Sequence, residues 1–297
     1  MWFENLLRKS RRPSFPPKNI FVGLIGGVGD LVLAAPSVAE LKKKFPEASI
    51  CFGVGPPPFH SAIKNDPHID RFETPFAYNV WRKRERRAVE RKKAEEFDLT
   101  LLLDNPDRDW WKAKKHLIDI YAERCGVSLE TRRPAMYLSR EDEAQGDEVL
   151  RRLGIAREDK LIVLAPEARS KKEIKEWPHS HFTRLIETIH KERCVKMVTF
   201  VSPSDLREYP GTAVVKDPPI GAAAAVIRRA DLFIGLDNGL THIAGRFDGR
   251  IVSVHIGFPA ECCGVLSPNA TVIAHEPFCR PDSIPVEEVY EKVDGLL

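Results

Sequence analysis

A short apolar run that ends in a glycine-rich turn constrains the fold of this chain more than any other segment. Residues 18–25 are apolar enough for a buried strand, and Gly26, Gly27 and Gly29 follow directly. Residues 30–45 then carry apolar side chains at helical spacing. A strand, a glycine turn and a helix in this order are typical of α/β proteins with a parallel sheet. The sequence therefore predicts an α/β fold.

The same alternation continues along the chain and restarts halfway. Strand-like runs are expected at residues 49–54 and 97–103, and a polar stretch at residues 139–147 marks a change in composition. After it we expect strands at residues 161–165, 195–201, 232–235 and 251–255, and helices at residues 180–190, 221–229, 242–247 and 286–296.

Two Rossmann-like domains that face each other across a cleft account for this repeated pattern. A chain of 297 residues suits two domains, because domains cluster near ~100–150 residues. Ligands of such sheets lie beyond the carboxyl ends of the strands, so the cleft is the expected site. We expect an N-terminal extension at residues 1–18, a first domain at 19–140, an interdomain region at 141–160, a second domain at 161–283 and a closing C-terminal helix at 284–297.

The charge differs between the two halves. Residues 1–140 carry 26 basic and 18 acidic side chains, a net charge of +8, whereas residues 141–297 carry 20 and 25, a net charge of −5. An acidic partner should therefore meet the first half. The densest basic run, residues 81–93, is also typical of a solvated helix face. The near-neutral total and the lack of a stacked aromatic platform argue against nucleic acid as the partner.

Membrane spans, export and disulfides are not indicated. No apolar run approaches the ~18–20 residues that cross a bilayer, and residues 2–12 place apolar before basic side chains, the reverse of a secretory signal. We therefore expect a cytoplasmic location. Six cysteines without a CxxC pair are typical of reduced thiols. A metal cluster of Cys262, Cys263 and Cys279 is an alternative, but zinc sites usually have paired ligands two to four residues apart.

The acidic residue after the glycine turn is the first candidate for chemistry. In one interpretation the turn lies close to a ligand and presents the Asp30 carboxylate to the cleft; in the other, Asp30 only caps the following helix. A dehydrogenase is a minor alternative. The glycine spacing is not G-x-G-x-x-G, and the second strand ends without an acidic residue for a ribose hydroxyl.

Two further segments follow strands of the second half. Residues 166–178 form a lysine-rich loop where ammonium groups could hold a diphosphate, although a solvated loop is the alternative. Residues 237–242 form a polar turn that opens a helix, and free N–H groups at Gly239, Leu240 and Thr241 would attract an anion. Besides these three, the turn contains Asp237, Asn238 and His242.

In these segments the chain resembles glycosyltransferase family 9, the bacterial heptosyltransferases that build the inner core of lipopolysaccharide. The resemblance spans nearly the whole chain in the right order. It is carried by GGVGDLVLAAPSVAELKKKFPEASI from residue 26, FDLTLLLD from residue 97, APEARSKKEIKEWPHSHFTRLI from residue 165, ADLFIGLDNGLTHIAG from residue 230 and IPVEEVYEKV from residue 284.

The resemblance implies a GT-B fold and an inverting, metal-independent transfer from ADP-heptose that needs no cofactor. Asp30 matches the family's catalytic aspartate, Lys175 its donor-phosphate lysine, and residues 237–242 its donor-binding turn. The sequence departs from the family pattern at Asn238, where Ser or Thr is usual, and at residues 167–168 and 257–259. The identity of the donor is therefore less firmly implied than its class.

The acceptor would be an acidic glycolipid saccharide at the inner face of a membrane. We expect it to contact basic residues of the 81–93 run, namely Arg82, Lys83, Arg84, Arg86 and Arg87.

Other interpretations remain open. Asp107 and Asp109 spell a DxD motif of the kind that binds a divalent metal in another transferase fold, but their spacing alone supplies no metal geometry. A catalytically silent nucleotide-sugar binding protein and a nucleotide-sugar epimerase are the alternative functions. If Asp30 is only a helix cap, Asp104 and Asp107 are the next candidates for a general base.

The order of residues 1–12 predicts peripheral membrane contact. Apolar Trp2, Phe3, Leu6 and Leu7 precede a basic group, and a basic residue near an anionic surface contributes ~1 kcal/mol. In a sedimentation assay the full chain should bind anionic vesicles more strongly than a shortened chain that begins at Lys18. Equal binding by both chains would remove the basis for membrane contact.

Overall fold

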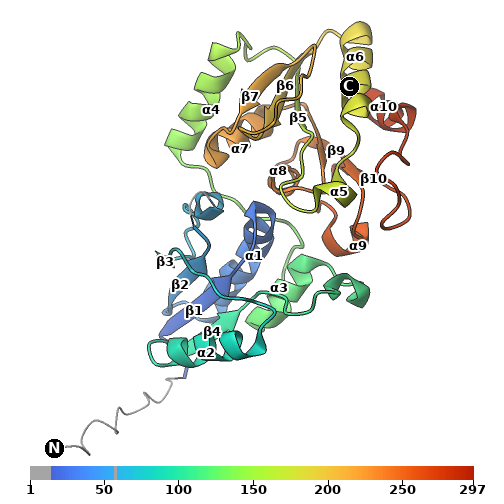
Figure 1. Ribbon diagram of the computed structural model, residues 1–297. Helices are drawn as coiled ribbons and strands as arrows, with labels where there is room; N and C mark the ends of the chain where they lie inside the picture. The colour runs from blue at the N-terminus through green and yellow to red at the C-terminus, as the bar shows by residue number, and fades with distance from the viewer. Residues whose placement is uncertain (1–14, 57–58) are drawn as a thin grey trace, which may run out of the picture.

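The computed structural model describes residues 15–56 and 59–297 and contains two parallel sheets (Figure 1). The first sheet has the strand order β3-β2-β1-β4. Its strands are β1 (Asn19–Leu24), β2 (Ser49–Val54), β3 (Arg71–Glu73) and β4 (Leu99–Leu102). The helical segments of this half are α1 (Val28–Lys44), η1 (Phe59–Ala62), α2 (Lys83–Ala94), η2 (Trp110–Ala113) and α3 (Leu117–Cys125).

The second sheet is larger and has the strand order β10-β9-β8-β5-β6-β7. Its strands are β5 (Leu161–Ala165), β6 (Lys196–Val201), β7 (Ala213–Lys216), β8 (Leu232–Leu236), β9 (Arg250–His255) and β10 (Ala270–Ala274). The helices of this half are α4 (Arg140–Arg152), α5 (Lys172–Lys175), α6 (His179–Glu192), α7 (Ile220–Arg229), α8 (Gly239–Ala244), α9 (Ala260–Cys263) and α10 (Val286–Asp294).

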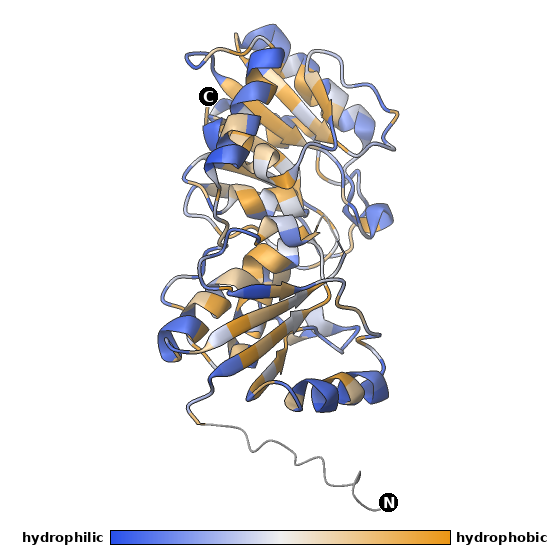
Figure 2. Ribbon diagram, turned by 90° about the vertical axis from the view of Figure 1, so that its left-hand side faces the viewer, coloured by the Kyte–Doolittle hydropathy of each residue, from blue (hydrophilic) through white to orange (hydrophobic). Residues whose placement is uncertain are grey.

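The central strands are mostly apolar and buried because helices cover both faces of each sheet. Every residue of β5 and β8 is buried, and Figure 2 shows the strands of both sheets mostly in the hydrophobic colour, with hydrophilic residues gathered on the helices. Continuous apolar strands of this kind belong to parallel sheets with two covered faces. The α/β fold predicted from the sequence is confirmed.

The polar stretch after residue 139 forms a helix that was not predicted from the sequence. Ser139 caps α4, since its hydroxyl accepts a hydrogen bond from the Asp142 N–H while the Asp142 carboxylate accepts one from the Ser139 N–H. Small residues then let α4 lie close to α7: a Cβ on Gly146 would come within 2.6 Å of the Ala225 Cβ. Residues 140–152 are therefore a packed helix within the expected interdomain region.

Trp177 is the largest fully buried side chain of the second half. Its indole Nε1 donates a hydrogen bond of 2.8 Å to the Ile284 carbonyl, and its ring meets Phe182 edge-on with 5.0 Å between centroids. The side chain therefore ties the end of the lysine-rich loop both to α6 and to the segment that leads into α10.

Residues 1–12, on which the membrane-contact prediction rests, lie outside the described residues, which begin at residue 15. Within residues 15–56 and 59–297, no helix combines the length and the apolar character that crossing a membrane requires.

Replacing Trp177 should destabilise the protein strongly. Trp177→Ala leaves a cavity and an unpaired Ile284 carbonyl, so the free energy of unfolding should fall by ~3–5 kcal/mol. Trp81 is 55% exposed, and Trp81→Ala is the matched control, with an expected change within about 0.5 kcal/mol. Urea unfolding followed by circular dichroism measures both. Equal stability of the two variants would contradict this role of Trp177.

Candidate active site

The carboxyl edges of the two sheets meet where two glycine turns touch. Helix α1 follows β1 and helix α8 follows β8, and the turns at their starts lie against each other. A Cβ on Gly29 would come within 2.8 Å of the His242 ring, and one on Gly239 within 3.2 Å of the Gly29 nitrogen. Only residues without a side chain allow this approach. The structure thus brings the glycine turn and the predicted donor turn together.

Asp30 lies at this junction, in the first turn of α1. The Gly27 N–H donates a 2.8 Å hydrogen bond to Asp30 Oδ2, so the capping interpretation is correct as far as it goes. The other oxygen, Oδ1, accepts a 2.7 Å hydrogen bond from the Tyr121 hydroxyl. A helix cap does not need this second contact. The carboxylate is held from two sides, as expected of a group whose direction matters.

Tyr121 belongs to α3 and was not predicted as a site residue from the sequence. Its side chain is buried, and burial together with the Asp30 charge raises the pKa of the phenol well above its usual value. The hydroxyl therefore stays protonated and donates to Asp30. No local pattern identifies this residue, because the contact joins positions 91 residues apart.

The carboxylate of Asp104, one of the alternative bases, is already hydrogen-bonded to residues of its own half. It accepts hydrogen bonds from the Ile25 N–H and the Tyr78 hydroxyl. Burial raises the pKa of Asp104. Asp107, the other alternative, is exposed and accepts a hydrogen bond from the Asp109 N–H, while Asp109 forms an ion pair with Lys112. The DxD motif is thus a surface turn in which one carboxylate already has a cation.

Two arginines reach the carboxyl end of β4. The Arg86 guanidinium donates to the carbonyls of Leu102, at 2.6 Å, and Asp104, at 3.2 Å. Arg124, from α3, donates to the same Asp104 carbonyl, and burial and the Arg86 charge lower its pKa. Arg124 was not predicted. It lies one helical turn from Tyr121, so it places positive charge near Asp30.

Four of the five basic residues expected to contact the acceptor lie at the surface, and Arg86 is the exception. Arg86 is only 17% exposed and ties α2 to β4. Arg82 stands at the N-terminal end of α2, where it pairs with Glu85. The other three are exposed on α2, namely Lys83, Arg84 and Arg87.

On the opposite edge, Lys175 and Asp237 form a buried ion pair. Lys175 Nζ lies 2.7 Å from Asp237 Oδ2, and the two side chains are only 13% and 4% exposed. Burial alone would lower the pKa of Lys175, but the Asp237 carboxylate raises it, and the charge of Asp30 acts in the same direction. Through Asp237, Lys175 is fixed at the turn that packs against Gly29, the neighbour of Asp30.

The Asp237 carboxylate stays ionised. Burial would raise its pKa, but contacts with His242 and with the Lys175 ammonium lower that pKa well below its usual range. His242 Nε2 lies 3.6 Å from Asp237 Oδ1. The aromatic ring of Phe258 covers the lysine, with 5.3 Å between Nζ and the ring centroid.

The donor turn differs in one respect from the sequence prediction. The Thr241 N–H donates to Asn238 Oδ1 at 3.0 Å, so it is not free for an anion as expected. Asn238 is the helix cap that uses it, and the amide of Asn238 also donates to the Ala165 and Glu167 carbonyls. Thr241 turns its hydroxyl to the Leu236 carbonyl. Binding of an anion by the N–H groups of Gly239 and Leu240 stays a prediction.

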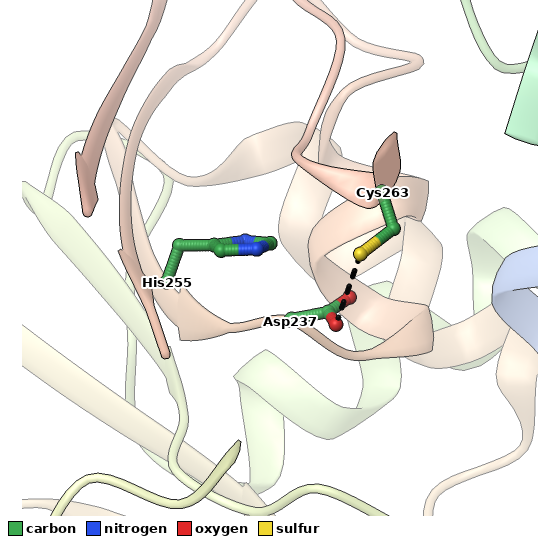
Figure 3. A group of neighbouring side chains, drawn as sticks. All are labelled: Asp237, His255 and Cys263. Carbon is green, nitrogen blue, oxygen red and sulfur yellow. Dashed lines mark hydrogen bonds between the residues drawn. The ribbon is translucent and has the colours of Figure 1, made fainter. Parts of the chain in front are cut away.

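Two further side chains lie beside Asp237: His255, which was not predicted, and Cys263, which the sequence suggested only as part of a cysteine cluster. Figure 3 shows His255 and Cys263 directed toward its carboxylate. The Cys263 sulfur lies 3.5 Å from Asp237 Oδ2, and burial and this carboxylate raise the pKa of the thiol well above its usual value. The suggested cysteine cluster does not form: Cys262 contacts the Trp111 carbonyl and Cys279 contacts Ser283.

Comparison with known proteins adds the family. No curated protein matches the chain. Among solved structures, a glycosyl transferase family 9 protein from Veillonella parvula is 19% identical, with 94% of this chain and 97% of that chain covered and a TM-score of 0.74. The ADP-heptose LPS heptosyltransferase II of E. coli is 16% identical (94% and 98% covered, TM-score 0.70). The iron-containing dodecameric glycosyltransferase TibC of E. coli is 14% identical (94% and 78% covered, TM-score 0.64).

These likenesses show that the fold is of the GT-B type. Residues 105–284 match glycosyltransferase family 9 (heptosyltransferase), a span that begins after Asp30 and contains Lys175 and the 237–242 turn. Because the match covers more than half of the chain, this protein belongs to glycosyltransferase family 9 and is a glycosyltransferase.

Proposed function

We propose that this enzyme transfers heptose, with inversion and without a metal or other cofactor, from ADP-heptose to an acidic saccharide of the lipopolysaccharide inner core. The observation that carries the proposal is that Asp30 and Lys175 come from facing sheet edges whose turns pack together, Asp30 beside Gly29 and Lys175 on Asp237 of the 237–242 turn. One group is a candidate base for the acceptor, and the other is a cation for the leaving diphosphate. A glycosyl transfer needs both at one place.

Lys175 is the proposed partner of the donor diphosphate. Its ammonium is charged, and its counter-ion, Asp237, is part of the same turn as the N–H groups of Gly239 and Leu240. A diphosphate that reaches this turn competes with Asp237 for the ammonium and gains a charge-assisted hydrogen bond. ADP as the nucleotide is supported by the name of the E. coli heptosyltransferase II, whose fold is similar.

Asp30 is the proposed general base. A sugar hydroxyl is a weak acid, so attack on the anomeric carbon opposite the leaving nucleotide requires a nearby acceptor for its proton. The Asp30 carboxylate has both oxygens oriented by hydrogen bonds, from Gly27 and from Tyr121, and it remains partly accessible. Each oxygen retains a lone pair for the hydroxyl.

An acidic acceptor fits the charges around Asp30. Arg86 and Arg124 bring two guanidinium groups to the end of β4, beside the buried carboxylate of Asp104, and Arg86 also pairs with Glu90. Arg124 has a backbone carbonyl as its hydrogen-bond acceptor within the described residues, which leaves donors for an incoming carboxylate. Together with the basic α2, they support a location at the cytoplasmic face of an anionic membrane.

Lys175→Ala should weaken the use of donor by ~10²-fold or more, because one preorganised charge contact with the leaving group is lost. Lys172→Ala is the matched control: this lysine belongs to the same short helix but is 52% exposed, so its loss should leave turnover nearly unchanged. Steady-state kinetics with ADP-heptose in the presence of EDTA measures both. Activity that chelator abolishes and a divalent metal restores would refute the metal-independent assignment.

Asp30→Asn should lower turnover by ~10²–10⁴-fold, because the amide keeps the shape of the carboxylate but cannot accept the hydroxyl proton. The dissociation constant of ADP should change little, and calorimetry measures it. Asp107→Asn serves as control, since Asp107 is an exposed aspartate of the same half. Near-normal turnover of Asp30→Asn with the native acceptor would reduce Asp30 to a helix cap.

A further inference from the structure

The group around Asp237 has a property that sugar transfer does not explain. Asp237 follows β8, His255 ends β9 and Cys263 ends α9, so the three side chains converge from separate elements (Figure 3). All three are buried, and one ligand atom from each lies within 4.8 Å of the other two. They form the one such group of three or more found within residues 15–56 and 59–297.

The chemistry of these atoms suits zinc. A carboxylate oxygen, an imidazole nitrogen and a thiolate sulfur are the ligands that Zn²⁺ takes in proteins, at about 2.0–2.3 Å. A triangle with edges of at most 4.8 Å has its centre within ~2.8 Å of each corner. An inward shift of roughly half an ångström per side chain therefore closes the coordination sphere. Side chains can supply this shift without movement of the backbone.

His255 is already in the form that binds a metal. Its Nε2 lies 2.8 Å from the Phe258 carbonyl, and a carbonyl can only accept, so Nε2 carries the proton and Nδ1 carries a lone pair. Nδ1 is buried without a hydrogen-bond partner among the described residues. A buried polar nitrogen without a partner calls for an explanation, and a ligand supplies one.

Lys175 is the competitor for this position. Its ammonium lies 2.7 Å from Asp237 Oδ2 and neutralises the carboxylate that a metal would need. Two cations cannot share one buried carboxylate at low cost. The site therefore has two exclusive states, one with Lys175 on Asp237 and one with a metal on Asp237.

We propose that Zn²⁺ binds to Asp237, His255 and Cys263, expels Lys175 from Asp237 and thereby blocks the donor site. The metal is an inhibitor in this account and takes no part in transfer. On binding, the Cys263 S–H bond breaks, a Zn–S bond forms, and the proton leaves to solvent; zinc keeps its charge of +2. The blocking effect rests on the proposed role of Lys175, whereas the binding of zinc does not.

Calorimetric titration of the full chain with zinc chloride, in a non-chelating buffer without donor or acceptor, tests the proposal. We expect one zinc ion per chain at this site. Cys263→Ser should weaken its binding at least 10-fold, and Lys175→Ala should tighten it, because the competing ammonium is gone. Opposite effects of Lys175→Ala on zinc and on donor would be a signature that a merely structural lysine does not produce.

Cys279→Ser is the control, since Cys279 contacts Ser283 and lies outside the group; it should bind zinc as the unaltered chain does. Thermal unfolding of each variant establishes that it is folded, and His255→Gln gives a second, independent ligand removal. Unchanged zinc affinity in Cys263→Ser and His255→Gln, or weaker binding in Lys175→Ala, would overturn the site. Absence of transfer activity in the unaltered enzyme without zinc would instead overturn the proposed function and leave the zinc result standing.

Discussion

The close contact between Gly29 and the turn at Gly239 and His242 is the constraint on which the site depends. The two sheets are separate, and their carboxyl edges meet where these turns pack closely, with Gly29 against the His242 ring and Gly239 against Val28 and the Gly29 nitrogen. A Cβ at Gly29 would come within 2.8 Å of the His242 ring and one at Gly239 within 3.0 Å of the Val28 Cβ, so the packed turns would have to shift. Further contacts between the halves follow from this approach, such as the 2.9 Å hydrogen bond between His116 Nε2 and the Gly264 carbonyl.

The ion pair of Lys175 and Asp237 is best understood from its position at that junction. Burying two charges costs several kcal/mol per ion, and mutual attraction repays this only in good geometry, so a buried pair is weak support for stability. A pair whose cation can exchange partners is more readily understood as part of a binding site. The ring of Phe258 and the low exposure of both side chains keep water out. A charged ligand that enters therefore interacts more strongly with this pair than it would in water.

Much of the fold could be predicted from the sequence, because apolar strands and glycine turns are local patterns. The strand at 161–165 agrees residue for residue with β5, and Asp30, Lys175 and Asp237 are in the segments that meet. Helix α4 was missed because its polar surface outweighs the narrow face that packs on α7. The edge strands β3, β7 and β10 were also missed; they are only partly buried, unlike the central strands β5 and β8.

The rest of the site could not be predicted because it depends on contacts between residues far apart in the chain. Tyr121 meets Asp30 across 91 positions, and Cys263 meets Asp237 across 26. The capping role of Asn238 was also not predicted: the Thr241 N–H in the first turn of α8 is bonded by the side chain of Asn238, the residue just before the helix.

The most direct test of the account is the stereochemistry and composition of the product. The enzyme is incubated with a deacylated inner-core acceptor and a panel of ADP-, UDP- and GDP-sugars, and the product is analysed by mass spectrometry and proton NMR of the new anomeric centre. The account predicts addition of one heptose from the ADP donor, with the anomeric configuration inverted relative to that donor. A retained configuration, or transfer from the UDP or GDP sugars alone, would contradict it.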